Sequence, residues 1–409
     1  MKNYLAFSLL ILTAQTAMNQ SLDYYLEEAL QKNPDLKAAY FSFEAQLEKV
    51  EQVKFLANPN LSFGYFILPV ETRLGSQQTK ISLNQIFPWF GTLSAKQDVA
   101  SLMAKAQFEQ FRYKQALLMF KVKTAYYNYL EAVELLEIHR QNLDIVKSHI
   151  NMARIAYSND KSKNTEVLEA NLMLDEITSD IHILEQRLNL LKKSFNRLLN
   201  RSDSLEIMTT ALASPTYFEI NNNPDSLLSN HPKIVALEQQ IAAAIIDENV
   251  ARKNGLPQIG VGIDYMIIQP IDGSNVKNNG KDALMPMVSL SLPIFRKKYQ
   301  SQTREIQLYQ KQLAFQKTEL QNTLAIEWSI AQNKRFESQA QYNLDEKRIQ
   351  NAHQDITFAF SDFKVANENF KNILESQRNL LKFKLSQVTW KRNYAEALAK
   401  MTYLISKEL

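Results

Sequence analysis

A heptad pattern of apolar residues runs from Leu118 to Tyr157, within a segment from Thr92 to Tyr157 that contains neither proline nor glycine. At a rise of about 1.5 Å per residue, one helix of this length extends about 100 Å. Apolar residues recur there at alternating steps of four and three positions, and only His139 breaks the series. A heptad kept over this distance predicts a supercoiled helix that packs on a partner helix.

The partner helix is predicted to follow directly in the sequence. The polar stretch Ser158–Asn164 ends the first heptad segment, and the same spacing resumes from Val167 to Leu198. This arrangement predicts a long helical hairpin over residues 92–200 with a solvated tip. A second long hairpin is predicted over residues 296–407, so the expected fold class is mainly α with a small β part.

Residues that break helices are confined to two short stretches of the chain. All eight glycines fall between Gly64 and Gly91 or between Gly255 and Gly280. Within these stretches, apolar side chains alternate with small or polar ones, which is the pattern of β-strands with one apolar face. We predict four strands, at about residues 60–68, 79–87, 258–266 and 285–292.

The apolar face of these strands admits two interpretations. Strands of about nine residues with one apolar and one small or polar face are typical of a water-filled membrane barrel, and two soluble hairpins packed on helices are the alternative. Aromatic residues at the strand ends suit a membrane interface, with Trp89, Phe90 and Phe295 as candidates. The lipid-facing candidates are Leu61, Phe63, Tyr65, Ile81, Leu83, Ile259, Val261, Ile263, Val288, Leu290 and Leu292.

Four strands are too few to close a barrel within one chain. Open strand edges are not tolerated in lipid, because their backbone groups would have no hydrogen-bond partners. The membrane interpretation therefore predicts an oligomer in which several copies of the chain pool their strands.

The second half of the chain repeats the first. Asn33-Pro34 corresponds to His231-Pro232, and Pro88-Trp89-Phe90 corresponds to Pro293-Ile294-Phe295. A repeated series of helix, two strands, long helix and closing helix predicts a tandem duplication. The predicted bounds are residues 18–201 for the first repeat, 202–230 for a linker or equatorial segment, and 231–409 for the second repeat.

Composition and charge indicate where the protein is located and which classes of partner it binds. Residues 1–17 combine Lys2 with a short apolar run, which predicts a secretory signal peptide with an uncertain cleavage site; a short helix of a cytosolic protein is the alternative. The net charge of +4 arises from 47 basic and 43 acidic residues without a basic block, which argues against a nucleic-acid partner. Because the chain has no cysteine, we expect neither disulfides nor a cysteine-linked lipid anchor.

Taken together, these features resemble the outer-membrane efflux protein family, the TolC-like channels. The resemblance covers nearly the whole mature chain and rests on a duplicated, ordered set of short motifs. These motifs are Leu22–Leu30 followed by Asn33-Pro34-Asp35-Leu36, Pro88-Trp89-Phe90-Gly91, Val288–Phe295, Glu166–Ala170 and Asn372–Ser376.

The resemblance implies a homotrimer in the outer membrane of a Gram-negative bacterium. Three chains would contribute twelve strands to one barrel in the outer-membrane lipid, and their helices would form a periplasmic α-barrel. Members of the family are exit ducts of tripartite efflux or type I secretion systems, which dock a periplasmic adaptor and, through it, an inner-membrane pump. A soluble periplasmic coiled-coil adaptor or scaffold is the alternative function.

The resemblance also implies roles for the helix tips. In the family, acidic side chains line a narrow periplasmic aperture at positions that match Asn372 and Glu375, while Glu166 and Glu169 lie near the other tip. A three-fold ring of Glu375 would favour cations, whereas an ordinary solvated glutamate at a helix start is the alternative. The adaptor-docking candidates are Ser158, Asn159, Asp160, Lys161, Asp362, Phe363 and Lys364.

The sequence shows no catalytic constellation. Its five histidines lack the spacing of metal ligands, and His139 on the heptad seam is expected to be a packed core residue. No glycine-rich loop precedes a helix in a phosphate-binding arrangement. We therefore expect no cofactor, no metal site and no enzyme activity.

Overall fold

The computed structural model describes residues 22–159, 163–216, 228–365 and 370–406. The predicted signal peptide and the tip residues Asp160 and Lys161 lie outside these ranges. The elements are α1 (Leu22–Lys32), α2 (Pro34–Gln52), β1 (Asn60–Thr72), β2 (Gly75–Phe87), α3 (Thr92–Ser158), α4 (Asn164–Leu198), α6 (Pro232–Asn254), β3 (Gln258–Gln269), β4 (Ala283–Ser291), α7 (Arg296–Val365) and α8 (Phe370–Ile405).

The chain forms two compact units. The first comprises residues 1–37, 115–222 and 326–409, and the second comprises residues 38–114 and 223–325. Because the division passes through α2, α3 and α7, each unit takes elements from both predicted repeats. A series of helix, two strands, long helix and closing helix recurs along the chain, while the repeat boundaries themselves stay a prediction.

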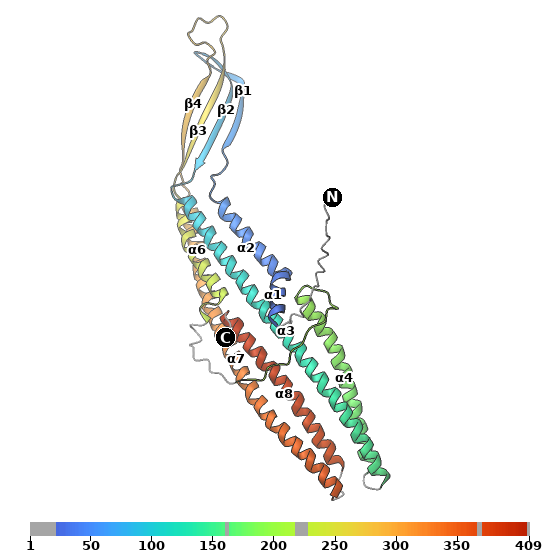
Figure 1. Cartoon of the computed structure of the whole chain (residues 1–409). Helices are drawn as coiled ribbons and strands as arrows, with labels where there is room; N and C mark the ends of the chain where they lie inside the picture. Colours follow the sequence, from blue (N-terminus) through green and yellow to red (C-terminus); the bar gives the residue numbers. More distant parts are fainter. Residues whose placement is uncertain (1–21, 160–162, 217–227, 366–369, 407–409) are drawn as a thin grey trace, which may run out of the picture. The chain divides into compact units, whose positions relative to one another are not determined.

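The second unit carries the β-sheet (Figure 1). Four antiparallel strands follow in the order β1-β2-β3-β4, so the pairing of β2 with β3 joins the two halves of the chain. The predicted strands are all present, but three are longer than expected. β1 extends to Thr72, β2 begins already at Gly75, and β3 extends to Gln269. β4 ends at Ser291, so Leu292 lies one residue beyond the strand in which it was predicted.

The tight turn between β1 and β2 explains part of the extra length. Thr72 pairs with Gly75, which leaves only Arg73 and Leu74 in the turn. Gly75 has a φ of 130°, and a Cβ at this position would lie 2.0 Å from the backbone oxygen of Gln269, so the position requires glycine. A register shift between Tyr65 and Val70 interrupts the regular alternation of apolar and polar residues. The alternation therefore did not predict the last residues of β1.

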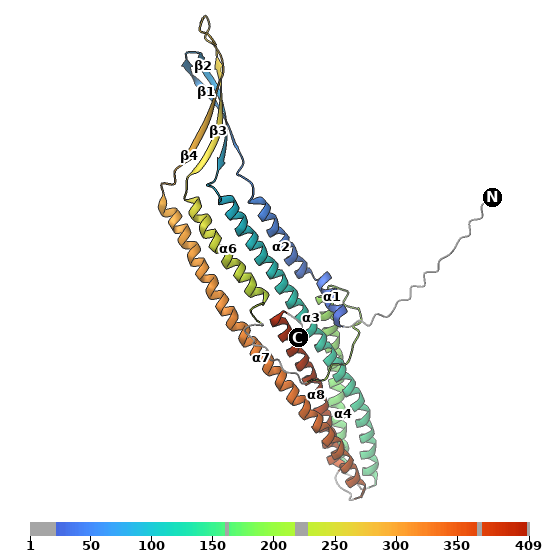
Figure 2. The same ribbon diagram turned by 60° about the vertical axis from the view of Figure 1, so that its left-hand side comes forward.

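Four helical segments of the second unit lie beside one another at one end of the sheet (Figure 2). α2 contacts α3, where the rings of Phe43 and Phe108 are 5.2 Å apart. α3 contacts α6, where the Nζ of Lys233 lies 4.1 Å from the centroid of the Tyr113 ring. α6 contacts α7 through an ion pair of 2.7 Å between Glu238 and Lys317. The order of neighbours is therefore α2, α3, α6, α7.

The first unit contains the remainder of α3 and α7 together with α4 and α8. The helix predicted from Thr92 to Tyr157 is confirmed as α3, and the partner helix begins at Asn164. At the start of α2, the side chain of Asn33 accepts a hydrogen bond from the backbone N–H of Leu36, so Asn33 is the N-cap of this helix. α2 ends at Gln52, and the chain then leads into β1.

The described part of the linker lies against helices of the first unit. Ile207 and Leu212 are buried, and the hydroxyl of Tyr126 donates to the backbone oxygen of Met208. The hydroxyl of Tyr394 donates to the backbone oxygen of Thr216 at 2.6 Å. The segment therefore holds α3 and α8 through backbone hydrogen bonds although it has no helical or strand periodicity.

Candidate functional site: an apolar strand face and a helical tip

The predicted lipid-facing residues form aligned rows on one face of the sheet. Residues opposite one another on neighbouring antiparallel strands share a face, so the register decides which side chains lie together. The first row is Leu61, Leu83, Ile263 and Pro286, and the second is Phe63, Ile81, Tyr265 and Leu284. A third row is Phe87, Ile259 and Leu290. Val261 pairs with Val288 on the same face.

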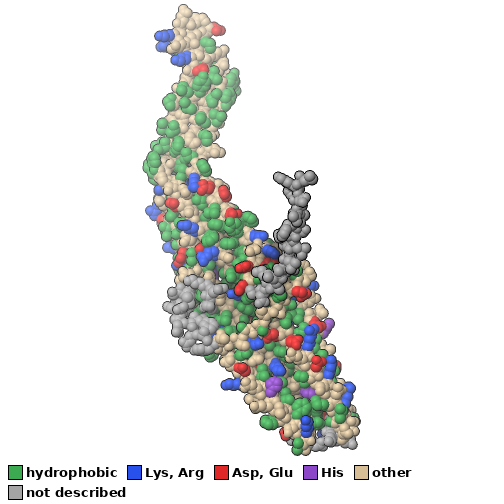
Figure 3. Space-filling view, in the orientation of Figure 1, with side chains coloured by type: hydrophobic (Ala, Val, Ile, Leu, Met, Phe, Trp, Pro, Cys, Tyr) green, Lys and Arg blue, Asp and Glu red, His purple; other side chains and the backbone are tan. Residues whose placement is uncertain are grey.

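This apolar face is open to the surroundings of the chain. Phe63 is 70% exposed and Val288 is 80% exposed, although both lie within strands. Figure 3 shows hydrophobic side chains gathered over the strands on the face in view. Exposed apolar patches of this extent mark a surface that another apolar phase or partner covers.

The opposite face of the sheet is polar. Ser62, Ser82 and Asp264 form one cross-strand row, and Asn84 lies beside Gly262 in the next. Asp264 is fully buried and forms an ion pair with Lys80 from the neighbouring strand. The predicted alternation thus holds at most positions, but Gln85 lies on the apolar face opposite Val261, and Met285 and Met287 of β4 lie on the polar face.

The predicted interfacial aromatics lie at the helix-proximal end of the strands. The rings of Trp89 and Phe90 are 5.9 Å apart in an edge-on arrangement, directly after β2. Phe90 and Phe295 are each 77% exposed. Both therefore present apolar rings to the surroundings next to the apolar strand rows, where an interfacial role would place them.

The helical tip in the first unit has its own apolar core. It joins all four long helices, so the two predicted hairpins pack on each other rather than standing alone. Its buried members are Val146, Ile150 and Ala153 of α3, Ala170, Met173 and Ile177 of α4, and Phe370, Ile373 and Leu374 of α8, against which Phe360 and Phe363 of α7 pack.

The structure separates the four aperture candidates by their exposure. Glu166 is buried, with 4% of its surface exposed, and Glu169 is half-buried. Asn372 and Glu375 are exposed, and the carboxylate of Glu375 lies 3.6 Å from the ammonium of Lys371 one turn away. Only Asn372 and Glu375 therefore present side chains openly to solvent, and Lys371 partly offsets the charge of Glu375.

The described docking candidates sit at the ends of α3 and α7. Ser158 and Asn159 are exposed, and their side chains both donate to the backbone oxygen of Ile155, which closes the end of α3. Asp362 and Lys364 are exposed. Phe363 is half-buried against the ring of Phe370 at 5.4 Å, so it belongs to the tip core as well as to its surface.

Two histidines of α3 are buried inside this unit. His139 is 6% exposed, as expected for a packed seam residue, and lies 4.0 Å from a carboxylate oxygen of Asp180. His149 is 3% exposed and meets the rings of Phe360 and Phe370. Burial lowers the pKa of both histidines, and Asp180 partly opposes this for the pKa of His139. Both are therefore held in the neutral form.

Buried polar contacts between helices were not foreseen from the sequence. The amide of Gln377 in α8 donates to the side-chain oxygen of Asn142 in α3 at 2.7 Å. Glu131 is 3% exposed and lies between Arg187 at 3.2 Å and Arg392 at 3.5 Å. These contacts fix the register of α3 against α4 and α8, because each buried group needs its partner.

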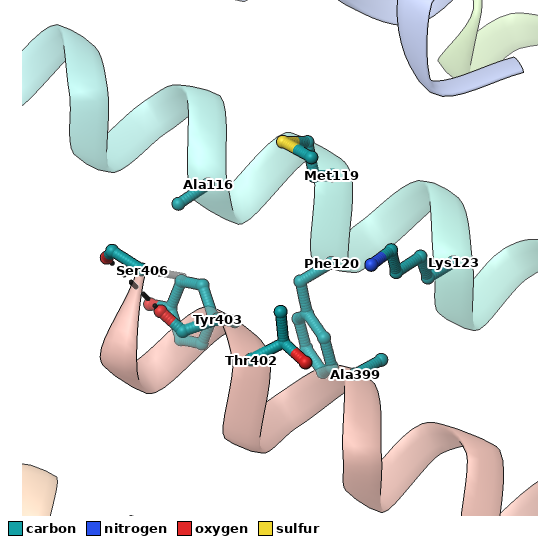
Figure 4. A pocket seen from close by; sticks show the side chains of 8 residues that line it. All are labelled: Ala116, Met119, Phe120, Lys123, Ala399, Thr402, Tyr403 and Ser406. Atoms are coloured by element: carbon teal, nitrogen blue, oxygen red, sulfur yellow. Dashed lines mark hydrogen bonds between the residues drawn. The ribbon is translucent and has the colours of Figure 1, made fainter. Parts of the chain in front are cut away.

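One concave site of the first unit is mainly apolar. A small apolar hollow between α3 and α8 is lined in part by the stacked rings of Phe120 and Tyr403, 5.4 Å apart (Figure 4). Lys123 is the one charged side chain among the residues that line it. Across the described parts of the chain, no three histidine, cysteine, aspartate or glutamate residues are placed to hold a metal ion. Nor is any helix in those parts both long and apolar enough to cross a membrane.

Comparison with known proteins relates this geometry to a family. Residues 25–188, from α1 to most of α4, match the family model described as outer membrane efflux protein. By this match over 164 of its 409 residues, the chain is similar to the outer membrane efflux protein family. No curated protein sequence matches it.

Solved structures of outer-membrane channels share the fold of this chain at low sequence identity. CusC has a TM-score of 0.82 at 16% identity, covering 96% of this chain and 93% of its own. The open state of the Neisseria gonorrhoeae MtrE channel has a TM-score of 0.78 at 16% identity, covering 94% and 89%. VceC from Vibrio cholerae has a TM-score of 0.76 at 15% identity, covering 95% and 96%. The similarity of fold therefore includes the second half of the chain, beyond the family match.

Proposed function

We propose that this protein is the outer-membrane exit duct of a tripartite efflux or type I secretion system. The observation that carries the proposal is the apolar face of the sheet, which runs in aligned rows across all four strands and is exposed. Its fold and the family that it resembles are those of passive outer-membrane channels of Gram-negative bacteria. A soluble periplasmic scaffold would leave these exposed rows in water, so the channel is the favoured function.

The duct is a homotrimer in this proposal. The outer edges of β1 and β4 carry backbone groups that lipid cannot satisfy, so neighbouring copies must cover them. Three copies supply twelve strands to one barrel with the apolar rows facing lipid and the Lys80–Asp264 face lining the lumen. The long helices continue as a conduit, and conduction is passive because an inner-membrane pump supplies the energy.

The helical tips are the proposed contact with the rest of the system. Ser158, Asn159, Asp362 and Lys364 are exposed there and are the proposed docking positions for the periplasmic adaptor. Glu375, with Asn372 one turn before it, is the proposed acidic position of the aperture. The burial of Glu166 favours a structural role for this residue in the tip rather than a place on the aperture wall.

A matched pair of lysine substitutions tests the membrane assignment. Ile263 lies at the middle of β3 on the apolar face, and Met287, opposite Gly262 on β4, lies at nearly the same depth on the polar face. Ile263→Lys should destabilise the membrane-inserted state by about 2–4 kcal/mol, whereas Met287→Lys should be tolerated. The readout is the amount of trimer in the outer-membrane fraction. Equal recovery of both variants would refute the lipid-facing assignment.

A further inference from the structure

Three methionines occupy neighbouring positions on the polar face of the sheet. Met285 of β4 lies opposite Asp264, and Met287 lies opposite Gly262. Met266 follows Asp264 by two residues on β3, so its side chain lies on the same face. The inner face of a water-filled barrel is normally small or polar, so a group of thioethers there is unexpected. Met266, Met285 and Met287 are called the thioether group below.

The strand register brings the thioether group together beside Asp264. Side chains directly opposite one another on antiparallel strands have Cβ atoms about 4.5–5.5 Å apart, and diagonal neighbours lie about 7–8 Å apart. Met285 is directly opposite Asp264, and Met287 is diagonal to Asp264. Met266 is diagonal to Met285. Because a methionine side chain has three rotatable bonds, thioethers at these separations can turn toward one ion between them.

The burial of Asp264 shows that long side chains already fold over this spot. Asp264 is fully buried, although the helices of its unit lie at one end of the sheet (Figure 2). The cover therefore comes from side chains on its own face of the sheet. Ser82 and Gly262 are too short to provide it, and the longest neighbours are Lys80 and the thioether group. Asp264 and the thioethers therefore share one small, partly shielded volume.

An ammonium group neutralises the carboxylate in this volume. The Nζ of Lys80 forms an ion pair with Asp264, and the Lys80 side chain is 34% exposed whereas that of Asp264 is 0% exposed. Lys80 can therefore turn toward solvent while the carboxylate stays in place. Since a buried carboxylate needs a positive partner, a cation that took the place of the ammonium group would keep Asp264 neutralised.

The donor atoms select the kind of cation. Thioether sulfur is a soft ligand that suits Cu(I), whereas Mg²⁺ and Ca²⁺ require oxygen ligands. Thioethers carry no charge, so the one carboxylate beside them balances a single positive charge. A soft monovalent ion therefore fits this donor set best. Because the set contains neither histidine nor cysteine, the spacing of the histidines in the sequence gives no sign of it.

We infer that the thioether group binds a soft monovalent cation such as Cu(I), with Asp264 balancing its charge after Lys80 turns away. In the proposed trimer, each chain contributes one such site to the lumen of the barrel, on the path of the exported solutes. This placement on the path rests on the proposed function. The site itself is complete within one chain, because all its residues belong to β2, β3 and β4 of that chain.

Equilibrium dialysis of the purified protein against silver nitrate in a chloride-free buffer tests the site. Ag(I) is the probe because it has the charge and the sulfur preference of Cu(I) and is not readily oxidised. Elemental analysis of the dialysed protein gives the amount of silver per chain. The wild type should bind an equimolar amount of silver, and Met285→Leu combined with Met287→Leu should lose it. Leucine and methionine have similar volumes, so this variant should still assemble.

Further variants separate this site from general affinity for methionine. Met103→Leu combined with Met119→Leu removes two thioethers from α3 and should bind silver as the wild type does. Lys80→Gln removes the competing ammonium group and should tighten silver binding about tenfold or more, because a like charge nearby disfavours a cation. Asp264→Asn should weaken silver binding by a similar factor. Wild-type affinity in both charge variants would refute the role of the carboxylate.

The outcomes separate this inference from the proposed function. Silver binding that is lost with Met285 and Met287 but kept in the α3 variant supports the site. A protein of trimer mass that binds no silver, or that binds it equally without these two methionines, overturns the site and leaves the channel proposal standing. A monomer in mild detergent overturns the proposed duct, whereas silver binding by that monomer would still support the site.

Discussion

Acidification should loosen the helical tip through His149. This side chain is 3% exposed, meets the rings of Phe360 and Phe370, and lies among the apolar residues of the tip core. Burial lowers the pKa of His149 below its ordinary value. Protonation in place would bury a charge without a partner among aromatic rings, so the protonated tip opens more readily.

The direction and size of this pH effect on tip opening follow from the linkage between opening and proton binding by His149. In the opened tip the histidine has a pKa of about 6.5, whereas in the packed tip its pKa is lower, so the opened state binds the proton more readily. The stabilising contribution is complete above about pH 6.5 and is lost as the pH falls toward the lower pKa. Within that window each pH unit removes about 1.4 kcal/mol, a factor of about ten in the opening equilibrium.

Hydrogen exchange with peptide-level resolution measures this opening. After correction for the intrinsic pH dependence of exchange, peptides around His149 and Phe370 should open up to about fivefold more often at pH 5.5 than at pH 6.5, because the opened-state histidine is already half protonated at its pKa of about 6.5. His149→Phe keeps an aromatic ring in the core and should abolish the pH dependence. His182→Gln, at an exposed position of α4, is the matched control and should behave as the wild type. An unchanged pH dependence in His149→Phe would refute the reasoning.

Three further predictions concern the sheet, the buried ion network and the tip. Gly75→Ala should reduce outer-membrane assembly, measured as trimer yield, because its Cβ meets the oxygen of Gln269, whereas Gly64→Ala has room and should assemble normally. Arg392→Leu should lower stability by about 1–3 kcal/mol in denaturant unfolding, because buried Glu131 loses one of its two arginines; unchanged stability would contradict this role. Glu375→Gln should reduce cation selectivity in single-channel recordings, and Lys371→Gln should increase it. Equal reversal potentials in the wild type and both variants would exclude the acidic ring.

Periodicity predicted the regular parts of this fold well. Long segments without glycine or proline and with heptad spacing of apolar residues favour helices. Accordingly, α3 begins and ends within one residue of the predicted bounds. Period-two alternation likewise identified all four strands and the apolar face, because a slip of one residue would turn Leu83 and Ile263 to the wrong side.

Strand ends and tip details depend on contacts that the sequence does not display. Val70 and Thr72 extend β1 because Gln77 and Gly75 pair with them, although the preceding Pro69 breaks the pattern. Glu166 resembles a solvated residue at a helix start, yet packing of four helices buries it. The bond between Asn142 and Gln377 joins positions far apart in the sequence, so neither residue carries a local signal.

The mass of the native protein in mild detergent, after separation of the cell envelope, tests the central claim most directly. The account predicts recovery from the outer membrane, a need for detergent, and a mass near three times that of the 47.2 kDa chain. A monomer or dimer that remains soluble in the periplasmic fraction without detergent would contradict it, because the apolar rows from Leu61 to Leu290 would then have no lipid to face.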